Sequence, residues 1–116
     1  MIKYSICILT YKRPKLLEKL LDSLYLQEKI NKSEFEIIVI DNDESQSAKI
    51  VVSSHKINNS YFSVRYYIQK KRNLSISRNL AINESKGYYI LFIDDDEHAD
   101  KFWAYELINS IYKYEA

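Results

Sequence analysis

Residues 88–97 read YYILFIDDDE, so that Asp94, Asp95, Asp96 and Glu97 directly follow an apolar run. A run of this length, rich in aromatic and β-branched residues, predicts a buried strand. Carboxylates crowded after a strand repel one another and favour a hard divalent cation such as Mg²⁺ or Mn²⁺, which in turn binds phosphate oxygens. The alternative is a solvated acidic turn. Because ligands of open α/β sheets bind at the carboxyl ends of strands, the position favours a metal–phosphate site.

Outside this stretch, predicted strands and helices alternate along the chain. Apolar runs predict further strands at residues 4–9, 35–40 and 64–68. Apolar residues at helical spacing predict helices at residues 16–26, 47–54, 75–84 and 102–112. Two of the strands are apolar without alternation, which is typical of a parallel sheet covered on both faces. The sequence therefore predicts an α/β protein with three layers, α/β/α, around a mainly parallel sheet.

The bulk composition limits the classes of protein to consider. The 116 residues suffice for one small domain, and the 47% of apolar and 28% of charged residues are ordinary for a globular chain. A formal net charge of +1 provides no basic surface for nucleic acid, so no nucleic-acid partner is expected. The apolar run at the N-terminus is too short for a signal peptide or a membrane span. We expect no transmembrane segment and a cytoplasmic location, either in the interior or peripherally at the inner face of the cell membrane.

Glycine, proline and cysteine each occur once, as Gly87, Pro14 and Cys7. A P-loop and a glycine-rich dinucleotide fingerprint both need several glycines, so any phosphate would be held by metal, basic side chains or helix N-termini. Pro14 suits the first turn of a helix. Gly87 lies just past a predicted helix, which predicts a left-handed C-terminal cap. A single Cys7 excludes an internal disulfide and a cysteine-based zinc site, and we expect it to be a buried strand residue.

The segments that follow the predicted strands carry charged side chains. In a parallel sheet these segments open on the same edge, so basic and acidic groups would converge on one crevice. Such a crevice suits a ligand with phosphates and a hydrogen-bonding base. The segments are residues 12–13, 41–43, 70–72 and 94–96.

Four segments in this order resemble the N-terminal, nucleotide-binding half of family 2 glycosyltransferases with the GT-A fold. They are SICILTYKRP at residues 5–14, FEIIVIDN at 35–42, NLSISRN at 73–79 and GYYILFIDDDE at 87–97. The resemblance runs through nearly the whole chain. It implies a donor domain that binds a nucleotide-diphospho-sugar, with a UDP-sugar expected, for glycosyl transfer in polysaccharide, lipopolysaccharide or glycan synthesis. Together with right-handed crossovers, it predicts the strand order 3-2-1-4 of a truncated, Rossmann-like GT-A fold.

The resemblance also implies roles for residues on the nucleoside side of the crevice. Thr10 and Tyr11 would border the nucleoside, with the Tyr11 ring stacked on the base. Asp41 would accept a hydrogen bond from the base, although a turn or helix N-cap residue is the alternative. Asp43 in the same loop is expected to contribute to nucleotide binding. Arg13 would attract the diphosphate, and the other loop cations with this potential are Lys12, Lys71 and Arg72.

The acidic residues match the DXD motif of the family. By that match Asp96 would bind Mn²⁺ or Mg²⁺, with Asp94 or Asp95 contacting the ribose or a metal-bound water, so Asp94 is a second metal candidate. The metal would bridge both phosphates and stabilise charge on the leaving nucleoside diphosphate. Arg78, from the Arg-Asn pair of the third motif, would face the crevice, and a solvated helix arginine is the alternative.

By the same resemblance, the acceptor site and the catalytic base come from a second half of the protein that follows the acidic motif. No residue here matches that base, so we assign no catalytic residue and leave activity of the chain alone open. We expect residues 1–116 to form a single donor-binding domain without the C-terminal acceptor half. The strand at residues 88–93 would then lie at a sheet edge, which a second copy or another chain is expected to cover.

Two other functions fit parts of the sequence. Residues 41–45 resemble the DXDX[TV] motif of haloacid-dehalogenase-like phosphohydrolases. Against that reading, the motif follows the second strand rather than the first, its fifth residue is Ser45, and no catalytic lysine stands out. The second alternative is a non-catalytic binding or interaction domain that keeps the fold without the chemistry.

Overall fold

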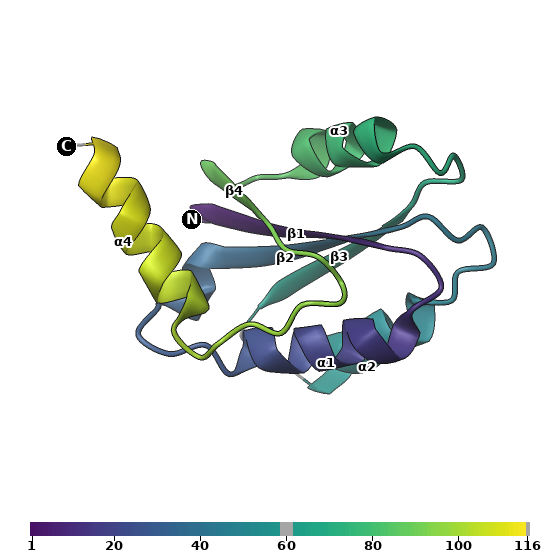
Figure 1. Ribbon diagram of the computed structural model, residues 1–116. Coiled ribbons are helices and arrows are strands. Elements are labelled where there is room, and N and C mark those ends of the chain that lie inside the picture. Colours follow the sequence, from purple (N-terminus) through teal and green to yellow (C-terminus); the bar gives the residue numbers. More distant parts are fainter. Residues whose placement is uncertain (59–61, 116) are drawn as a thin grey trace.

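The computed structural model describes residues 1–58 and 62–115 and contains a single sheet with helices packed on it (Figure 1). Pro14 stands in the first turn of α1, as the sequence predicts. A short 3-10 helix, η1, precedes the second strand. The elements are β1 (Tyr4–Thr10), α1 (Pro14–Tyr25), η1 (Lys32–Glu34), β2 (Phe35–Asp41), α2 (Lys49–Asn58), β3 (Ser63–Ile68), α3 (Leu74–Glu84), β4 (Tyr89–Phe92) and α4 (Trp103–Glu115).

The four strands are all parallel and lie in the order β3-β2-β1-β4, which confirms the predicted topology. In the register, Tyr4 lies between Phe35 and Tyr89, and Thr10 lies opposite Asp41. β4 pairs only with β1 in the described part of the chain, so it forms an edge, as predicted. The parallel arrangement brings the carboxyl ends of all strands to one side of the sheet.

Apolar side chains fill both faces of the sheet, and this gives the three predicted layers. α3 covers one face, where Cys7 packs with Ala81 of the helix and is fully buried, as expected. α1 and α2 cover the other face, and Leu17 and Leu20 of α1 are fully buried there (Figure 1). α4 packs on this same core beside the amino ends of β1 and β2. Among the described residues, no helix is both long enough and apolar enough to cross a bilayer.

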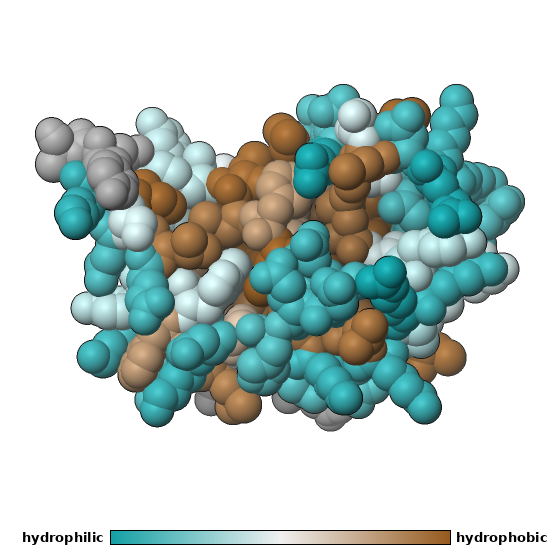
Figure 2. Space-filling view, in the orientation of Figure 1, coloured by the Kyte–Doolittle hydropathy of each residue, from teal (hydrophilic) through white to brown (hydrophobic). Residues whose placement is uncertain are grey.

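The edge formed by β4 exposes large side chains. Tyr88 is 84% exposed and Phe92 is 42% exposed. Figure 2 shows apolar side chains gathered over β4 in the central part of this face. α4 shields the start of the edge, where the Tyr112 ring lies 6.5 Å from that of Tyr89.

The prediction that Gly87 forms a left-handed cap is wrong. No glycine has a positive φ, and α3 ends at Ser85 in an extended conformation (φ −69°, ψ 132°). The reason for glycine is the close approach of β1, because a Cβ on Gly87 would lie 2.6 Å from both the backbone nitrogen and the Oγ of Ser5. Gly87 therefore lets the chain enter β4 directly against β1, and its N–H donates to Ser5 Oγ at 2.8 Å.

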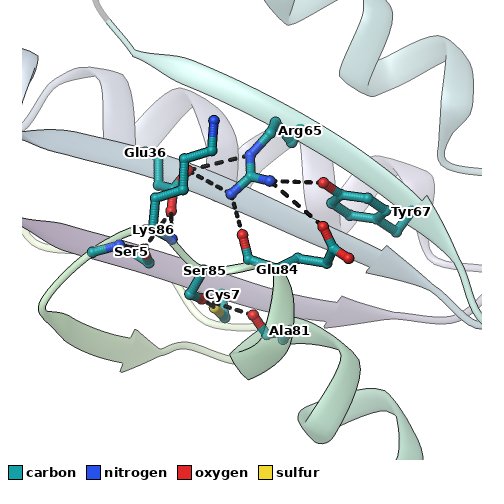
Figure 3. Close-up of polar contacts among 10 residues, drawn as sticks. Ser5, Cys7, Glu36, Arg65, Tyr67, Ala81, Glu84, Ser85 and Lys86 are labelled. Carbon is teal, nitrogen blue, oxygen red and sulfur yellow. Dashed lines mark hydrogen bonds and ion pairs between the residues drawn. The ribbon is translucent and has the colours of Figure 1, made fainter. Parts of the chain in front are cut away.

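A buried polar network fixes this entry to β4 (Figure 3). The Glu36 carboxylate, 1% exposed, accepts hydrogen bonds from Ser5 Oγ at 2.5 Å and from the Lys86 backbone N–H at 2.7 Å. Arg65 on β3 donates to the other carboxylate oxygen from Nη2 at 2.7 Å and from Nε at 3.2 Å. Arg65 also donates to the carbonyl of Glu84 at the end of α3. The network ties β1, β2 and β3 to the segment that leads into β4 and its acidic residues.

The protonation of Glu36 follows from these contacts. Burial by itself would raise the pKa of the carboxyl group. The hydrogen bonds from Ser5, from the Lys86 N–H and from Arg65, together with the charge of Arg65, outweigh burial and lower the pKa. Glu36 is therefore held as a carboxylate inside the sheet layer.

Candidate functional site

A hollow of about 390 Å³ lies at the carboxyl ends of the strands, and all four loops that follow the strands contribute to it. The convergence expected from the sequence is therefore present. The hollow is wide open and its wall mixes apolar, aromatic and charged groups. Its lining residues are Leu9, Thr10, Tyr11, Arg13, Asn42, Arg72, Leu74, Asp94, Asp95 and Asp96.

Asp95 is the carboxylate that joins the end of β1 and the loop after it to the segment after β4. Its side chain is 9% exposed, and its Oδ2 accepts a hydrogen bond from Thr10 Oγ1 at 2.9 Å. Its Oδ1 accepts from Arg13 Nη1 at 3.4 Å. Since both oxygens are engaged, Asp95 holds the end of β1 against the segment after β4.

Asp94 and Asp96 flank this buried residue and are exposed, the Asp96 side chain to 55%. The backbone N–H of Asp94 donates to Glu97 Oε1 at 3.1 Å, which closes the acidic segment into a turn. Asp96 Oδ2 lies 3.8 Å from Arg13 Nη1. Both carboxylates therefore retain oxygens that face solvent at the rim of the hollow.

These residues fit a divalent ion that is shared with a ligand. In the described part of the chain, no three His, Cys, Asp or Glu side chains are grouped closely enough to hold a metal by themselves. Mg²⁺ and similar hard ions are commonly bound by one or two carboxylates together with substrate phosphates. The exposed oxygens of Asp94 and Asp96 meet the protein part of that requirement.

The Tyr11 ring forms an aromatic part of the wall and carries a cation on it. The guanidinium of Arg72 lies 3.8 Å from the ring centroid, and the Lys12 ammonium lies 5.4 Å from it. Lys12 has a φ of 53°, and this left-handed residue turns the chain from β1 toward α1. The arrangement adds a stacking surface and positive charge to the wall of the hollow.

Asp41 does not line the hollow. Its carboxylate is fully buried and accepts from the backbone N–H of Asp43 at 2.9 Å and of Ala48 at 3.1 Å. The Tyr66 hydroxyl donates to Asp41 Oδ2 at 2.6 Å, and burial together with this bond raises the pKa of Tyr66. Asp43 is also buried and accepts from the Ser45 N–H at 2.9 Å. Both aspartates therefore build the turn after β2, which is the alternative that the sequence had left open for Asp41.

Asn42 is the residue of this loop that lines the hollow, although no individual role was expected for it from the sequence. Its N–H donates to the Thr10 carbonyl at 2.9 Å, and its Nδ2 donates to the Gln69 carbonyl at 2.9 Å. Nδ2 also lies 2.7 Å from Ser77 Oγ on α3. Alternation of side chains along an extended segment was the available signal, since it places residues 41 and 42 on opposite sides.

Arg78 is not brought to the hollow. It is exposed on α3, where its guanidinium lies 5.9 Å from the centre of the Phe92 ring on β4. This matches the alternative of a solvated helix arginine. Of the expected nucleotide- and metal-binding residues, the structure brings together Thr10, Tyr11, Arg13, Asp94, Asp95 and Asp96.

Comparison with known proteins gives this arrangement a family. The family model "Glycosyl transferase family 2" matches residues 5–116. The chain belongs to this family. Its fold is the GT-A fold, which it shares with similar solved structures.

Three similar proteins illustrate the match. The chain is 32% identical over 106 residues to the succinoglycan biosynthesis protein ExoM of Rhizobium meliloti, covering 91% of the chain and 34% of ExoM. The structure of S. aureus TarS 1–349 in complex with UDP-GlcNAc aligns at a TM-score of 0.82 and 24% identity, covering 97% of this chain and 32% of that one. The mannosyltransferase PcManGT of Pyrobaculum calidifontis, in complex with GDP-Man and Mn²⁺, aligns at 0.78 and 18% identity, with coverages of 86% and 29%. The chain spans about a third of the length of these relatives.

Proposed function

We propose that this chain is a donor-binding domain that holds a nucleotide-diphospho-sugar, a UDP-sugar in the first instance, through Mn²⁺ or Mg²⁺ for glycosyl transfer. The observation that carries the proposal is the meeting of an aromatic face, two exposed carboxylates and basic side chains in one hollow at the strand ends. Membership of family 2 supports it. Further support comes from two structural relatives, one in complex with UDP-GlcNAc and one with GDP-Man and Mn²⁺.

In this proposal the Tyr11 ring offers its face to the base, and Thr10 borders the ribose while it holds Asp95 in place. Asp94 and Asp96 would hold the divalent ion, with the donor diphosphate supplying further oxygens. The metal, when bound, neutralises charge on the leaving nucleoside diphosphate. Arg13 contributes positive charge on the diphosphate side.

The role proposed for Asp41 changes with the structure. A carboxylate that is fully buried and accepts three hydrogen bonds is not free to bind a base. We propose that Asp41 and Asp43 instead build the turn that presents Asn42 to the hollow. The same burial weakens the phosphohydrolase alternative, because its nucleophilic aspartate would have to reach a phosphorus atom.

The remaining parts of the proposal concern the whole protein. We propose that residues 1–116 supply the donor half, and that the acceptor site and the catalytic base lie outside them. The work of the whole protein would be in polysaccharide or other cell-envelope glycan synthesis, at the inner face of the membrane. ExoM, a protein of succinoglycan biosynthesis, supports the part of this assignment that concerns polysaccharide synthesis.

Calorimetric titration of UDP, GDP, dTDP and CDP, each in Mn²⁺ and in chelator, tests the proposal. We expect UDP to bind best and to bind more tightly in Mn²⁺, because the metal offsets repulsion between the diphosphate and the carboxylates. Asp96→Asn should remove the metal-dependent part of the affinity. Glu18→Gln, an exposed carboxylate on α1 outside the hollow, is the matched control. Equal UDP affinity in Mn²⁺ and in chelator would contradict the proposed site and favour a non-catalytic interaction domain.

A further inference from the structure

Arg13 lines the hollow beside two carboxylates of the acidic turn. It directly precedes Pro14 at the start of α1, and its backbone carbonyl accepts the first helical hydrogen bond, from Leu17 N–H at 3.0 Å. This anchors its Cα, while the side chain forms no cap and extends across the hollow. The guanidinium is 3.4 Å from Asp95 Oδ1 and 3.8 Å from Asp96 Oδ2, measured from one nitrogen, Nη1.

One cation therefore contacts two neighbouring carboxylates, which follow β4, the strand paired with β1. The Arg13 side chain is 52% exposed and Asp96 is 55% exposed, so this part of the cluster can rearrange without unfolding the core. Asp95, 9% exposed and bonded to Thr10, is the fixed member. The guanidinium therefore lies beside Asp96, one of the two carboxylates proposed to attract a divalent cation.

We propose that Arg13 is an internal counter-cation that a divalent metal must displace, so that tight metal binding requires the diphosphate. The inference rests on the proposed function of the hollow. A metal ion that bound Asp96 without a nucleotide would have to break the contact of Arg13 with that carboxylate and would leave the guanidinium close to a second cation. When a diphosphate arrives with the metal, the guanidinium can move to a phosphate oxygen, which is a charge-assisted partner of equal quality.

The exchange makes metal and nucleotide affinities depend on each other. Binding of one partner removes a cost from the binding of the other, and this coupling must be the same in both directions. Arg13 would thereby act as a positioning residue that keeps free divalent ions from occupying the acidic turn in the absence of donor. Its removal should raise affinity for the metal alone and reduce the coupling.

The test measures Mn²⁺ binding without nucleotide, from the electron paramagnetic resonance signal of free Mn²⁺, in the wild type and in Arg13→Gln. We expect the variant to bind Mn²⁺ alone about three- to tenfold more tightly, as befits the loss of two partly exposed ion pairs. Arg13→Lys, which keeps the charge, should stay close to the wild type. Lys15→Gln removes a charge from an exposed residue of the same helical turn that does not line the hollow, and is the matched control.

A second arm titrates UDP into each protein in Mn²⁺ and in chelator. The gain in UDP affinity on adding Mn²⁺ should be smaller in Arg13→Gln than in the wild type, by about the factor found for the metal alone. If the wild type binds UDP in a metal-dependent way and Arg13→Gln leaves its Mn²⁺ affinity unchanged or weaker, the counter-cation proposal is overturned and the proposed function stands. An equal increase in Mn²⁺ affinity in Lys15→Gln also overturns the counter-cation proposal, because the effect would then come from the net charge of the protein and not from Arg13. No Mn²⁺ binding by any variant at millimolar concentration, with metal-independent UDP binding, overturns both.

Discussion

Replacing Glu36 by Gln should destabilise the protein strongly, although the change alters one atom. The Glu36 carboxylate accepts from Ser5, from the Lys86 N–H and twice from Arg65, and it is 1% exposed. An amide offers one acceptor oxygen, and its NH₂ group would face donors that the carboxylate now satisfies. At least one buried donor loses its partner, and Arg65 loses its counter-charge.

The magnitude follows from this environment. Breaking a buried ion pair on one side typically costs about 3–5 kcal/mol, and an unsatisfied buried donor costs about 1–3 kcal/mol. Because the Arg65 side chain is 21% exposed, water can compensate part of the lost charge interaction. We therefore expect a loss of about 3 kcal/mol in the free energy of unfolding, which for a domain of this size lowers Tm by roughly 10–15 °C.

Urea denaturation and thermal melting of Glu36→Gln measure this loss, with Glu34→Gln as the matched control. Glu34 forms an ion pair with Lys3 at 2.9 Å, but both side chains are partly exposed, at 27% and 47%. Such pairs are worth about 0–1 kcal/mol, so the control should change little. The double variant Glu36→Gln with Arg65→Met should cost clearly less than the sum of the two single changes, because each single variant already breaks the pair. Equal losses of unfolding free energy for Glu36→Gln and Glu34→Gln, or an additive double variant, would contradict a stabilising pair between Glu36 and Arg65.

Gly87→Ala should lower the free energy of unfolding by about 1–3 kcal/mol, since its Cβ would meet the Ser5 backbone at 2.6 Å, and an unchanged Tm would contradict the close approach. Asp41→Asn should lower the free energy of unfolding by about 2 kcal/mol, because it weakens the bonds of Asp41 to Tyr66 and to the turn. It should also weaken UDP binding in Mn²⁺ and in chelator alike. Weaker UDP binding with unchanged stability would instead indicate direct contact of Asp41 with the base. Because the pKa of Glu36 is lowered in the folded state, its stabilising contribution is present above the ordinary carboxyl pKa and is lost as pH falls through the lower folded-state pKa. The urea midpoint should therefore fall further between pH 7 and pH 3 for the wild type than for Glu36→Gln.

The sequence was enough to predict the strand order and the edge of the sheet at which the hollow lies. Continuous apolar runs specify buried parallel strands because only such strands are covered on both faces, and the right-handed crossover rule then leaves few strand orders. The motif match and the parallel arrangement together placed Thr10, Tyr11, Arg13 and the acidic turn at one edge, where the structure has them. These conclusions depend on local pattern and on chain connectivity, both of which are written in the sequence.

Which side chains line the hollow and which are engaged in internal contacts depends on the tertiary structure. Asp41 and Asn42 are neighbours in sequence, yet the buried Asp41 carboxylate accepts three hydrogen bonds, whereas Asn42 lines the hollow. Gly87 is required by the approach of β1, more than 80 residues earlier in the chain, and not by the end of its own helix. Asp95 is engaged because Thr10, at the end of β1, and Arg13, in the loop after β1, both donate to its carboxylate. In each case the partner comes from a distant segment, and its position is set by packing that no local pattern encodes.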